Sequence, residues 1–335
     1  MKVCIIGGSG HYQYVLDGLA GAQVSLVGYA PGVADEKLEK LESALKAAGV
    51  EAPRFARWQD MLDELRPDIV VVNTWFGACA AISMECLRRG HHVYAEKPLA
   101  TTLDDLHALR AVYLEGLGAQ LGAMFGLRYV PAMYSAWRFV RAGGIGAVRM
   151  VGAQKSYRLG RREVFYHTRD SYGGTIPWVG AHAVDWVRWF AGAEFERVTA
   201  LHSTQGNRGQ GEVEVTAACL FAMAGGVIGH VNLDYLRPDS QRRHDDDRVR
   251  VVGTEGVLEV RDGQVTMWRE GAAEAVQLQL ESPPQCFADF VAGLRGQGCL
   301  VSAEDAFAVT EASLLARQAA DAGGTASFSS QRLGD

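Results

Sequence analysis

Short apolar runs alternate with amphipathic stretches along the first third of the chain. The apolar runs are typical of buried strands, and the amphipathic stretches carry their apolar residues at helical spacing. The expected strands are residues 3–6, 24–27, 68–72, 92–95 and 120–124, and the expected helices are residues 11–19, 35–48, 77–89 and 102–113. Because strands separated by helices form βαβ units, this part is predicted to be an α/β domain with a doubly wound parallel sheet.

The pattern changes after residue 124. Strand-like runs follow with few helices between them, and glycine turns such as Asp262-Gly263 separate the runs, as hairpins require. The expected strands are residues 147–157, 197–202, 213–221, 227–235, 249–252, 257–260 and 264–268, and the expected helices are residues 132–141, 179–190, 286–294 and 303–320. This pattern predicts an α+β domain with an open, mainly antiparallel sheet. We place the two domains at residues 1–123 and 124–325, and we expect the tail after Gly323 to be frayed.

Composition narrows the class of protein. Hydrophobic residues make up 48% of the 335 residues, which suits a globular protein with a sizeable core. The formal net charge of -6 leaves no basic face for phosphates, so we expect no nucleic-acid partner. The chain enters a strand without a charged leader and has no apolar run long enough to cross a bilayer, so we expect neither a signal peptide nor a membrane partner. Six cysteines without CxxC spacing favour reduced thiols and a cytoplasmic protein.

A glycine-rich turn, Gly7-Gly8-Ser9-Gly10-His11-Tyr12, follows the first predicted strand. In a Rossmann domain this turn holds the pyrophosphate of a dinucleotide, because glycines let the backbone approach and the next helix offers free N–H groups. The expected cofactor contacts are therefore Gly7, Gly8, Ser9, Gly10, His11 and Tyr12. The spacing departs from GxGxxG, and such a turn can also serve only to join a strand to a helix.

The end of the second predicted strand bears on the choice of dinucleotide. An acidic residue at this point binds the ribose hydroxyls of NAD, and an arginine accommodates the 2′-phosphate of NADP. The strand ends Val27-Gly28-Tyr29-Ala30-Pro31 with neither, and Asp35 lies past its end. The expected cofactor is therefore NAD or NADP.

Six short motifs stand in order along the chain. They are Thr74 with Trp75 and Phe76, Glu96-Lys97-Pro98, Arg128-Tyr129, Gly143-Gly144-Ile145-Gly146, Gly180-x-His182-x-x-Asp185, and Val252-Gly253-Thr254-Glu255-Gly256. Together they resemble the glucose–fructose oxidoreductase and inositol dehydrogenase family (Gfo/Idh/MocA) over nearly the whole chain. The resemblance implies an oxidoreductase that transfers a hydride between nicotinamide and a secondary alcohol of a sugar, a polyol or a related small molecule.

The resemblance also implies roles for two residues. Lys97 would sit by the reacting hydroxyl, where its charge favours an alkoxide-like oxygen, and His182 would take or return the proton. Thr74, Trp75, Glu96 and Lys97 would lie beside the cofactor. Taken alone, Lys97 could be a solvated lysine and His182 a core histidine.

One position departs from the family. Many catalytic members carry an aspartate four residues before the histidine, where this chain has Trp178. An indole cannot accept or relay a proton as a carboxylate does. Either Lys97 and His182 suffice, or another carboxylate such as Asp170 substitutes, or the alcohol chemistry is lost. Trp178 itself could stack on a sugar face or be a buried aromatic residue.

The segment from Tyr157 to Tyr172 is rich in tyrosine, arginine and histidine. Such side chains bind hydroxyls, and arginine binds carboxylates with two hydrogen bonds, although a solvated loop has the same composition. The expected substrate contacts are Arg128, Tyr157, Tyr166, Trp178 and His182. We predict no metal site at His244-Asp245-Asp246-Asp247, because adjacent carboxylates on a strand end point in different directions.

Two other functions fit the same residues. One is a catalytically silent dinucleotide-binding sensor or interaction subunit, suggested by Trp178 and by the irregular glycine spacing. The other is an NAD-dependent glycosidase that uses transient oxidation. In each case the partner is a small molecule, and the uncovered face of an open sheet predicts a homodimer or homotetramer.

Overall fold

The computed structural model describes residues 1–116 and 118–328. The chain forms two compact units. Unit 1 contains Met1–Tyr129, Arg169–Gly173 and Pro284–Thr310, and unit 2 contains Val130–Thr168, Gly174–Pro283 and the chain from Glu311 onward. Each unit therefore takes its residues from separate stretches of the chain, and the domain boundary after residue 123 remains a prediction.

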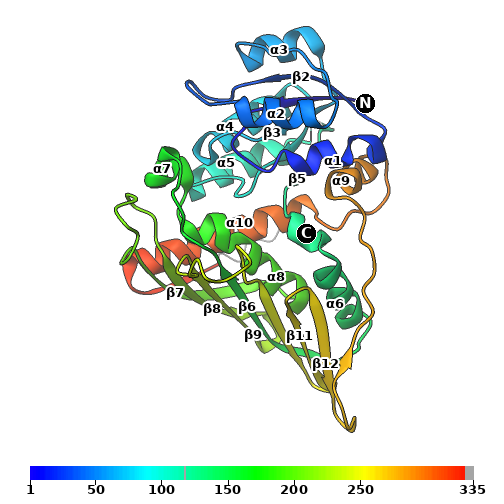
Figure 1. Cartoon of the computed structure of the whole chain (residues 1–335), viewed down its shortest axis with the longest axis vertical. Coiled ribbons are helices and arrows are strands. Elements are labelled where there is room, and N and C mark those ends of the chain that lie inside the picture. Colours follow the sequence, from blue (N-terminus) through cyan, green and yellow to red (C-terminus); the bar gives the residue numbers. More distant parts are fainter. Residues whose placement is uncertain (117, 329–335) are drawn as a thin grey trace. The chain divides into compact units, whose positions relative to one another are not determined.

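Unit 1 is built on the predicted parallel sheet, of which β2, β3 and β5 are labelled in Figure 1. Its five strands have the order β2-β1-β3-β4-β5. The strands are β1 (Lys2–Ile6), β2 (Ser25–Ala30), β3 (Ile69–Val72), β4 (His92–Ala95) and β5 (Leu121–Ala123). Their central residues, such as Ile5 and Val71, are fully buried, as strands covered on both faces require. The order reverses between β1 and β3, and open α/β sheets bind ligands at the carboxyl ends of strands beside such a switch point.

Helices connect these strands. They are α1 (Gln13–Ala22), α2 (Glu39–Ala47), α3 (Trp58–Leu65), α4 (Phe76–Arg88) and α5 (Leu103–Leu114), together with the 3-10 turn η1 (Gly126–Tyr129) and the short helix α7 (Arg169–Tyr172), which contacts α4. Helix α9 (Cys286–Leu294) returns from late in the chain to pack on α1. Its Phe287 and Phe290 belong to the same buried cluster as Val3 and Val15.

Unit 2 contains a nine-stranded sheet of order β13-β12-β11-β10-β6-β9-β8-β7-β14. Its strands are β6 (Val148–Ser156), β7 (Phe195–Ser203), β8 (Thr216–Met223), β9 (Val227–Asp234), β10 (Arg248–Gly253), β11 (Gly256–Arg261), β12 (Gln264–Arg269), β13 (Val276–Gln277) and β14 (Thr325–Ser327). Every neighbouring pair is antiparallel except β6 and β9, which are parallel. The prediction of a mainly antiparallel second sheet is therefore confirmed.

One face of this sheet is covered by helices. Helix α8 (Ala181–Ala191) packs on β6 and β9 (Figure 1). Helix α6 (Pro131–Arg141) contacts α8, where Trp137 and Trp189 stack with ring centroids 4.7 Å apart. A π-helical turn, η3 (Ile176–Gly180), leads directly into α8. The short 3-10 turns are η2 (Val164–His167) and η4 (Ala224–Gly226). Helix α10 (Ala303–Ala322) belongs to unit 1 up to Thr310 and to unit 2 from Glu311.

Three local features of the structure differ from what the sequence predicts. The helix expected at residues 35–48 begins at Glu39, because the chain before it turns so that Glu36 is buried. Helix α3 was not predicted, since only Met61 and Leu62 of its short sequence are buried. The expectation of a frayed tail is wrong for Thr325–Ser327, which pair with β7 as strand β14, while residues 329–335 lie outside the described residues.

Candidate active site

The glycine turn lies at the carboxyl end of β1 and is bound to the end of β3. Gly7 has φ +88°, and a Cβ on it would come within 2.5 Å of the backbone of Thr74. The N–H groups of Ser9 and Gly10 both donate to the carbonyl oxygen of Asn73, at 2.9 and 3.2 Å. Glycine at position 7 is therefore required by the close approach of two chain segments.

A buried carboxylate that the sequence prediction missed lies against this turn. Glu36 accepts hydrogen bonds from the Gly8 N–H (3.1 Å) and the Ser9 hydroxyl (2.6 Å). It also accepts from the Gly32 N–H (2.9 Å) and the Thr74 hydroxyl (2.8 Å). These four donors surround an anionic group at the place where a Rossmann domain binds a dinucleotide. The signal available in the sequence was the pair Asp35-Glu36, of which only the exposed Asp35 was considered.

A second buried carboxylate, Glu96, binds the glycine turn just before the start of helix α1. Glu96 follows β4 and accepts the N–H of His11 at 2.7 Å, and its Oε2 lies 2.8 Å from His11 Nδ1. Its other oxygen accepts the N–H of Lys97 at 3.0 Å. Burial opposes ionisation of Glu96, but the charge and hydrogen bonds of His11 and the charge of Lys97 outweigh it and lower the pKa of Glu96. The carboxylate therefore holds the Gly10–His11 turn as an anion.

Lys97 is only 1% exposed, so it is not a solvated surface lysine. It comes directly after the carboxyl end of β4, which puts it at the ligand-binding edge of the sheet. Thr74 is fully buried, and Trp75, half-buried, occupies the position just before α4. Tyr12 occupies the position just before α1 and is half-buried, and burial raises its pKa.

Arg128 is buried inside unit 1. Its Nη1 donates to the carbonyl oxygen of Leu300 and lies 3.1 Å from Asp305 Oδ2. The neighbouring Tyr129 hydroxyl donates to Asp289 Oδ2 at 2.7 Å. These contacts tie η1 to α9, to the loop after it and to the start of α10, and the contact of Arg128 with substrate remains a prediction.

His182 lies in the first turn of α8 in unit 2 and is 6% exposed. Trp178 precedes it by one turn, in η3, where its backbone N–H donates to the Gly174 carbonyl oxygen at 3.1 Å. π-helical turns inside helices are frequent at functional sites. Asp185, one turn after His182, is also buried. Asp170, considered as a substitute carboxylate, is exposed on α7 in unit 1.

Trp178 belongs to a cluster of aromatic rings in unit 2. Its ring centroid lies 4.6 Å from that of Tyr166 and 6.4 Å from that of Tyr235. Tyr157 lies beside Tyr235 at 6.4 Å and stacks on His244 at 5.1 Å. The structure therefore brings together three of the predicted substrate contacts, Tyr157, Tyr166 and Trp178, and adds Tyr235, which was not predicted. We call these rings, with His244, the aromatic cluster.

A buried ion pair that was also not predicted lies beside this cluster. Lys155 Nζ is 2.6 Å from Asp247 Oδ2 and 4.6 Å from the ring centroid of Tyr157. Burial lowers the pKa of Lys155, opposed by the charge of Asp247, and burial raises the pKa of Asp247, opposed by the charge of Lys155. The only sequence signal was a lysine inside an apolar strand, because its partner lies 92 residues away.

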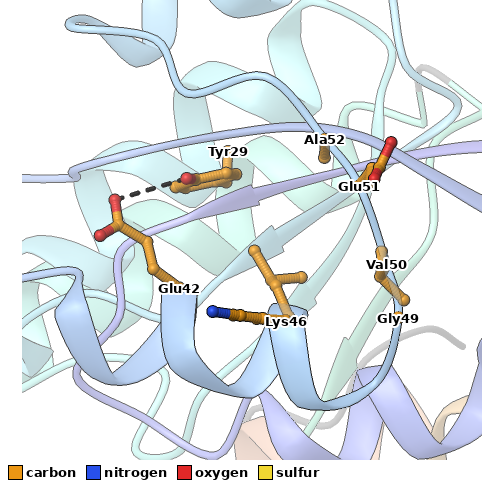
Figure 2. A pocket seen from close by; sticks show the side chains of 8 residues that line it. Tyr29, Glu42, Lys46, Gly49, Val50, Glu51 and Ala52 are labelled. Atoms are coloured by element: carbon orange, nitrogen blue, oxygen red, sulfur yellow. Dashed lines mark hydrogen bonds between the residues drawn. The ribbon is translucent and has the colours of Figure 1, made fainter.

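A hollow of about 340 Å³ opens elsewhere in unit 1, beside α2 (Figure 2). Tyr29 and Glu42 face each other across it, and the tyrosine hydroxyl donates to the Glu42 carboxylate at 3.4 Å. Its wall is formed by Tyr29, Glu42, Leu45, Lys46, Gly49, Val50, Glu51 and Ala52. The predicted site residues are not part of this wall, so we do not identify it with the candidate site.

Residues 1–116 and 118–328 contain no group of three or more histidine, cysteine, aspartate and glutamate side chains placed to hold a metal ion. The described helices also include none that is both long and apolar enough to span a membrane.

A glycine turn at the switch point of a parallel sheet, with Lys97 buried at the same edge, defines a dinucleotide-dependent oxidoreductase. Residues 1–116 match the oxidoreductase family with an NAD-binding Rossmann fold, and residues 134–259 match the GFO/IDH/MocA C-terminal domain. The chain belongs to the Gfo/Idh/MocA family of NAD-binding oxidoreductases, as the sequence motifs predicted.

Known relatives cover almost the whole chain. It is similar to a Thermotoga maritima protein described as an oxidoreductase, with 42% identity and a TM-score of 0.95 over 98% of this chain and 100% of that one. It is 26% identical to inositol 2-dehydrogenase 1 of Saccharopolyspora erythraea over 92% of this chain and 91% of that enzyme. A levoglucosan dehydrogenase in complex with NADH has the same fold, with a TM-score of 0.83, 17% identity and 98% of both chains covered.

Proposed function

We propose that this protein transfers a hydride between the nicotinamide of NAD and a secondary alcohol of a sugar, polyol or related small molecule. The observation that carries the proposal is the buried Lys97, placed after Glu96 at the carboxyl end of β4. The likeness to inositol 2-dehydrogenase 1 along the full chain supports an alcohol of this class as substrate.

The cofactor contacts that we propose are Gly7, Gly8, Ser9, Gly10, His11, Tyr12, Thr74, Trp75, Glu96 and Lys97. To these we add Glu36. A carboxylate that follows the second strand of a Rossmann domain suits the ribose hydroxyls of NAD, and its charge disfavours the 2′-phosphate of NADP. When bound, the dinucleotide would supply the hydride acceptor or donor.

The protein supplies charge and proton transfer. Lys97 would stabilise the negative charge that develops on the substrate oxygen, since a charge in a site that excludes water acts more strongly than in solvent. His182 would take the hydroxyl proton during oxidation and return it during reduction, because imidazole titrates near neutral pH. Trp178 would then pack against the substrate rather than relay a proton, and Arg128, Tyr157 and Tyr166 complete the proposed substrate contacts.

The test combines binding, turnover and one substitution. NAD should raise the unfolding temperature, and a panel of sugars and polyols should contain a substrate. Lys97→Met keeps the aliphatic stem but removes the charge, so kcat should fall at least about 100-fold while the circular dichroism spectrum is kept. Lys46→Met, on the exposed side of α2, is the matched control. No response to NAD or NADP would overturn the proposal.

A second function, a dinucleotide-binding sensor without catalytic activity, is favoured by one observation. Trp178, which cannot relay a proton, stands at the family's aspartate position. Such a protein would bind NAD but leave every member of the substrate panel unchanged.

We further propose that the uncovered face of the unit 2 sheet binds a second copy of the chain, giving a homodimer or homotetramer. Leu201, Leu220 and Ile228 lie on neighbouring strands β7, β8 and β9, with 66%, 54% and 44% of their surface exposed. Apolar side chains gathered on one sheet face are typical of protein interfaces.

The six free cysteines favour a reducing cytoplasm, and the net charge of -6 disfavours a nucleic-acid partner.

A further inference from the structure

One arginine of unit 2, Arg162, lies against the aromatic cluster, and the backbone of a second, Arg158, pairs with Leu236 and His244 beside it. The guanidinium carbon of Arg162 is 4.7 Å from the ring centroid of Tyr235 and 5.4 Å from that of Trp178. One of its terminal nitrogens donates to the carbonyl oxygen of Arg158 at 3.2 Å. A guanidinium contacts aromatic rings through its flat faces. Its N–H groups lie in the plane of the group and are therefore able to donate hydrogen bonds to an acceptor beside the aromatic cluster.

Both guanidinium groups carry donors without an acceptor. The Nε atoms of Arg158 and Arg162 are buried, and neither has a hydrogen-bond partner among the described residues. A buried donor of a charged group is costly to leave without an acceptor, so an anion that accepted from these two groups would gain the energy that is otherwise lost.

The carboxylates of the surrounding loops are already engaged. Asp247 pairs with Lys155. Asp246 pairs with Arg237 and Arg248, and Asp245 lies 4.0 Å from Arg243. The remaining neighbour, Asp234, accepts the Ser156 hydroxyl and the Leu236 N–H.

In the described part of the chain, neither Arg158 nor Arg162 has a carboxylate within 4.0 Å, so their two positive charges are unmatched. Burial is the main cause that lowers the pKa of His244, and the charges of Arg162, Arg158 and Lys155 lower it further against the opposing charge of Asp245. The region beside the aromatic cluster is therefore positive.

The same region adjoins the proposed proton-transfer residue. Trp178, on which Arg162 rests, precedes His182 by one turn of a continuous helical segment. A substrate group held by Arg162 would thus belong to the molecule that His182 acts on.

We propose that Arg158 and Arg162 form a subsite for an anionic group of the substrate, a carboxylate or a phosphate. This inference rests on the proposed function and narrows its substrate class from neutral polyols to acidic sugars or sugar phosphates. Guanidinium groups bind both anions with paired, charge-assisted hydrogen bonds, which neutral hydroxyls do not match. Tyr157 and Tyr166, the partly exposed tyrosines of the aromatic cluster, would supply the apolar surface for the sugar ring.

The experiment compares substrates in matched sets. NAD-dependent oxidation is measured for glucose, glucuronate and glucose 6-phosphate, and for inositol and its monophosphate. An anionic member should exceed its neutral parent by about 10-fold or more in kcat/KM, since one charge-assisted pair discriminates by about this factor. The uronate and phosphate arms show which anion is bound.

Three variants locate the effect. Arg162→Gln and Arg158→Gln should each lower kcat/KM for the anionic substrate by about 10-fold or more, mainly through KM, and leave the neutral parent nearly unchanged. Arg161→Gln, at an exposed position next to Arg162, is the matched control and should behave as wild type. Calorimetric titration of glucuronate and of inorganic phosphate into the protein with NADH should show binding that Arg162→Gln weakens.

Failure of the anionic subsite and failure of the proposed function would give different results. Equal or better turnover of the neutral parents, unaffected by Arg162→Gln, overturns the anionic subsite and leaves the proposed function intact. No NAD binding and no turnover overturns the proposed function, and the calorimetric titration of the anions then decides the subsite by itself. If titration of glucuronate and of inorganic phosphate gives no heat of binding in either the wild type or the variant, the proposed anionic subsite is overturned.

Discussion

At the scale of single residues, two buried glutamates organise the glycine turn from opposite sides. Glu96 holds the backbone at His11, and Glu36 binds the donors at Gly8 and Ser9. Only Glu96 was predicted, because it stands in the motif Glu96-Lys97-Pro98. Glu36 follows β2 after an irregular loop, and no fixed spacing connects such a residue to the glycine turn.

The charge of Glu36 should set the choice between NAD and NADP. A 2′-phosphate beside this buried carboxylate is repelled, and Glu36→Gln removes the charge while keeping an acceptor oxygen. The ratio of the NADP to the NAD dissociation constant should narrow by about 10-fold, or ~1.4 kcal/mol. Fluorescence titration of both dinucleotides measures it.

The control for this change is Glu39→Gln, in the exposed first turn of α2. This substitution also removes one negative charge, close to Glu36 in the sequence. It should leave the ratio of the NADP to the NAD dissociation constant unchanged. An unchanged ratio in Glu36→Gln itself would remove Glu36 from the determinants of cofactor choice.

Other site residues could not be found from sequence for the same reason. Asp247 meets Lys155, and Tyr235 meets Trp178, only because the nine-stranded sheet brings distant strand ends together. A motif identifies residues that share a local segment, and a buried pair across a sheet has no local pattern. The resemblance to a family supplied Lys97 and His182, but their environments came from the structure.

At the scale of elements, the alternation of apolar and polar residues was sufficient to predict most of the strands and helices. It failed for short elements with few buried positions, such as α3 and β14. The parallel pairing of β6 with β9 could also not be predicted from the sequence, since β7 and β8 lie between them in the chain and β9 returns to the middle of the sheet, between β6 and β8.

Strand β14 leads to a prediction about the edge of the unit 2 sheet. It covers β7, and Phe328 stacks on Phe195 with centroids 5.6 Å apart. Ending the chain after Gly324 should lower the free energy of unfolding by about 1–2 kcal/mol and increase aggregation, because an uncovered strand pairs with other chains. Urea unfolding and light scattering measure these effects.

A chain that ends after Phe328 is the control for that truncation, since it retains β14 and its stacked ring. It should unfold at the same urea concentration as the full chain. If both truncations behave alike, β14 contributes nothing to the stability of the sheet edge.

At the scale of the whole molecule, the exposed sheet face of unit 2 predicts self-association. Leu220→Glu places a charge among Leu201 and Ile228, which are exposed on the neighbouring strands. A charge at the centre of an apolar interface is desolvated without a partner, so the assembly should dissociate. Size-exclusion chromatography with light scattering should give the mass of an assembly for wild type and of a single chain for the variant.

Leu114→Glu, at an equally exposed position on α5 of unit 1, is the control and should leave the mass unchanged. A wild-type protein that elutes as a single chain across micromolar concentrations would contradict the proposed interface.

The late return of α9 to unit 1 has a consequence for how the protein is made. The first 129 residues contain the whole parallel sheet, yet Phe287 and Phe290 complete the apolar cluster around α1. A ribosome must therefore synthesise nearly all of unit 2 before the nascent unit 1 can close its core. Until then the surface of α1 around Gly18 stays open to solvent, and this is where a chaperone would bind the growing chain.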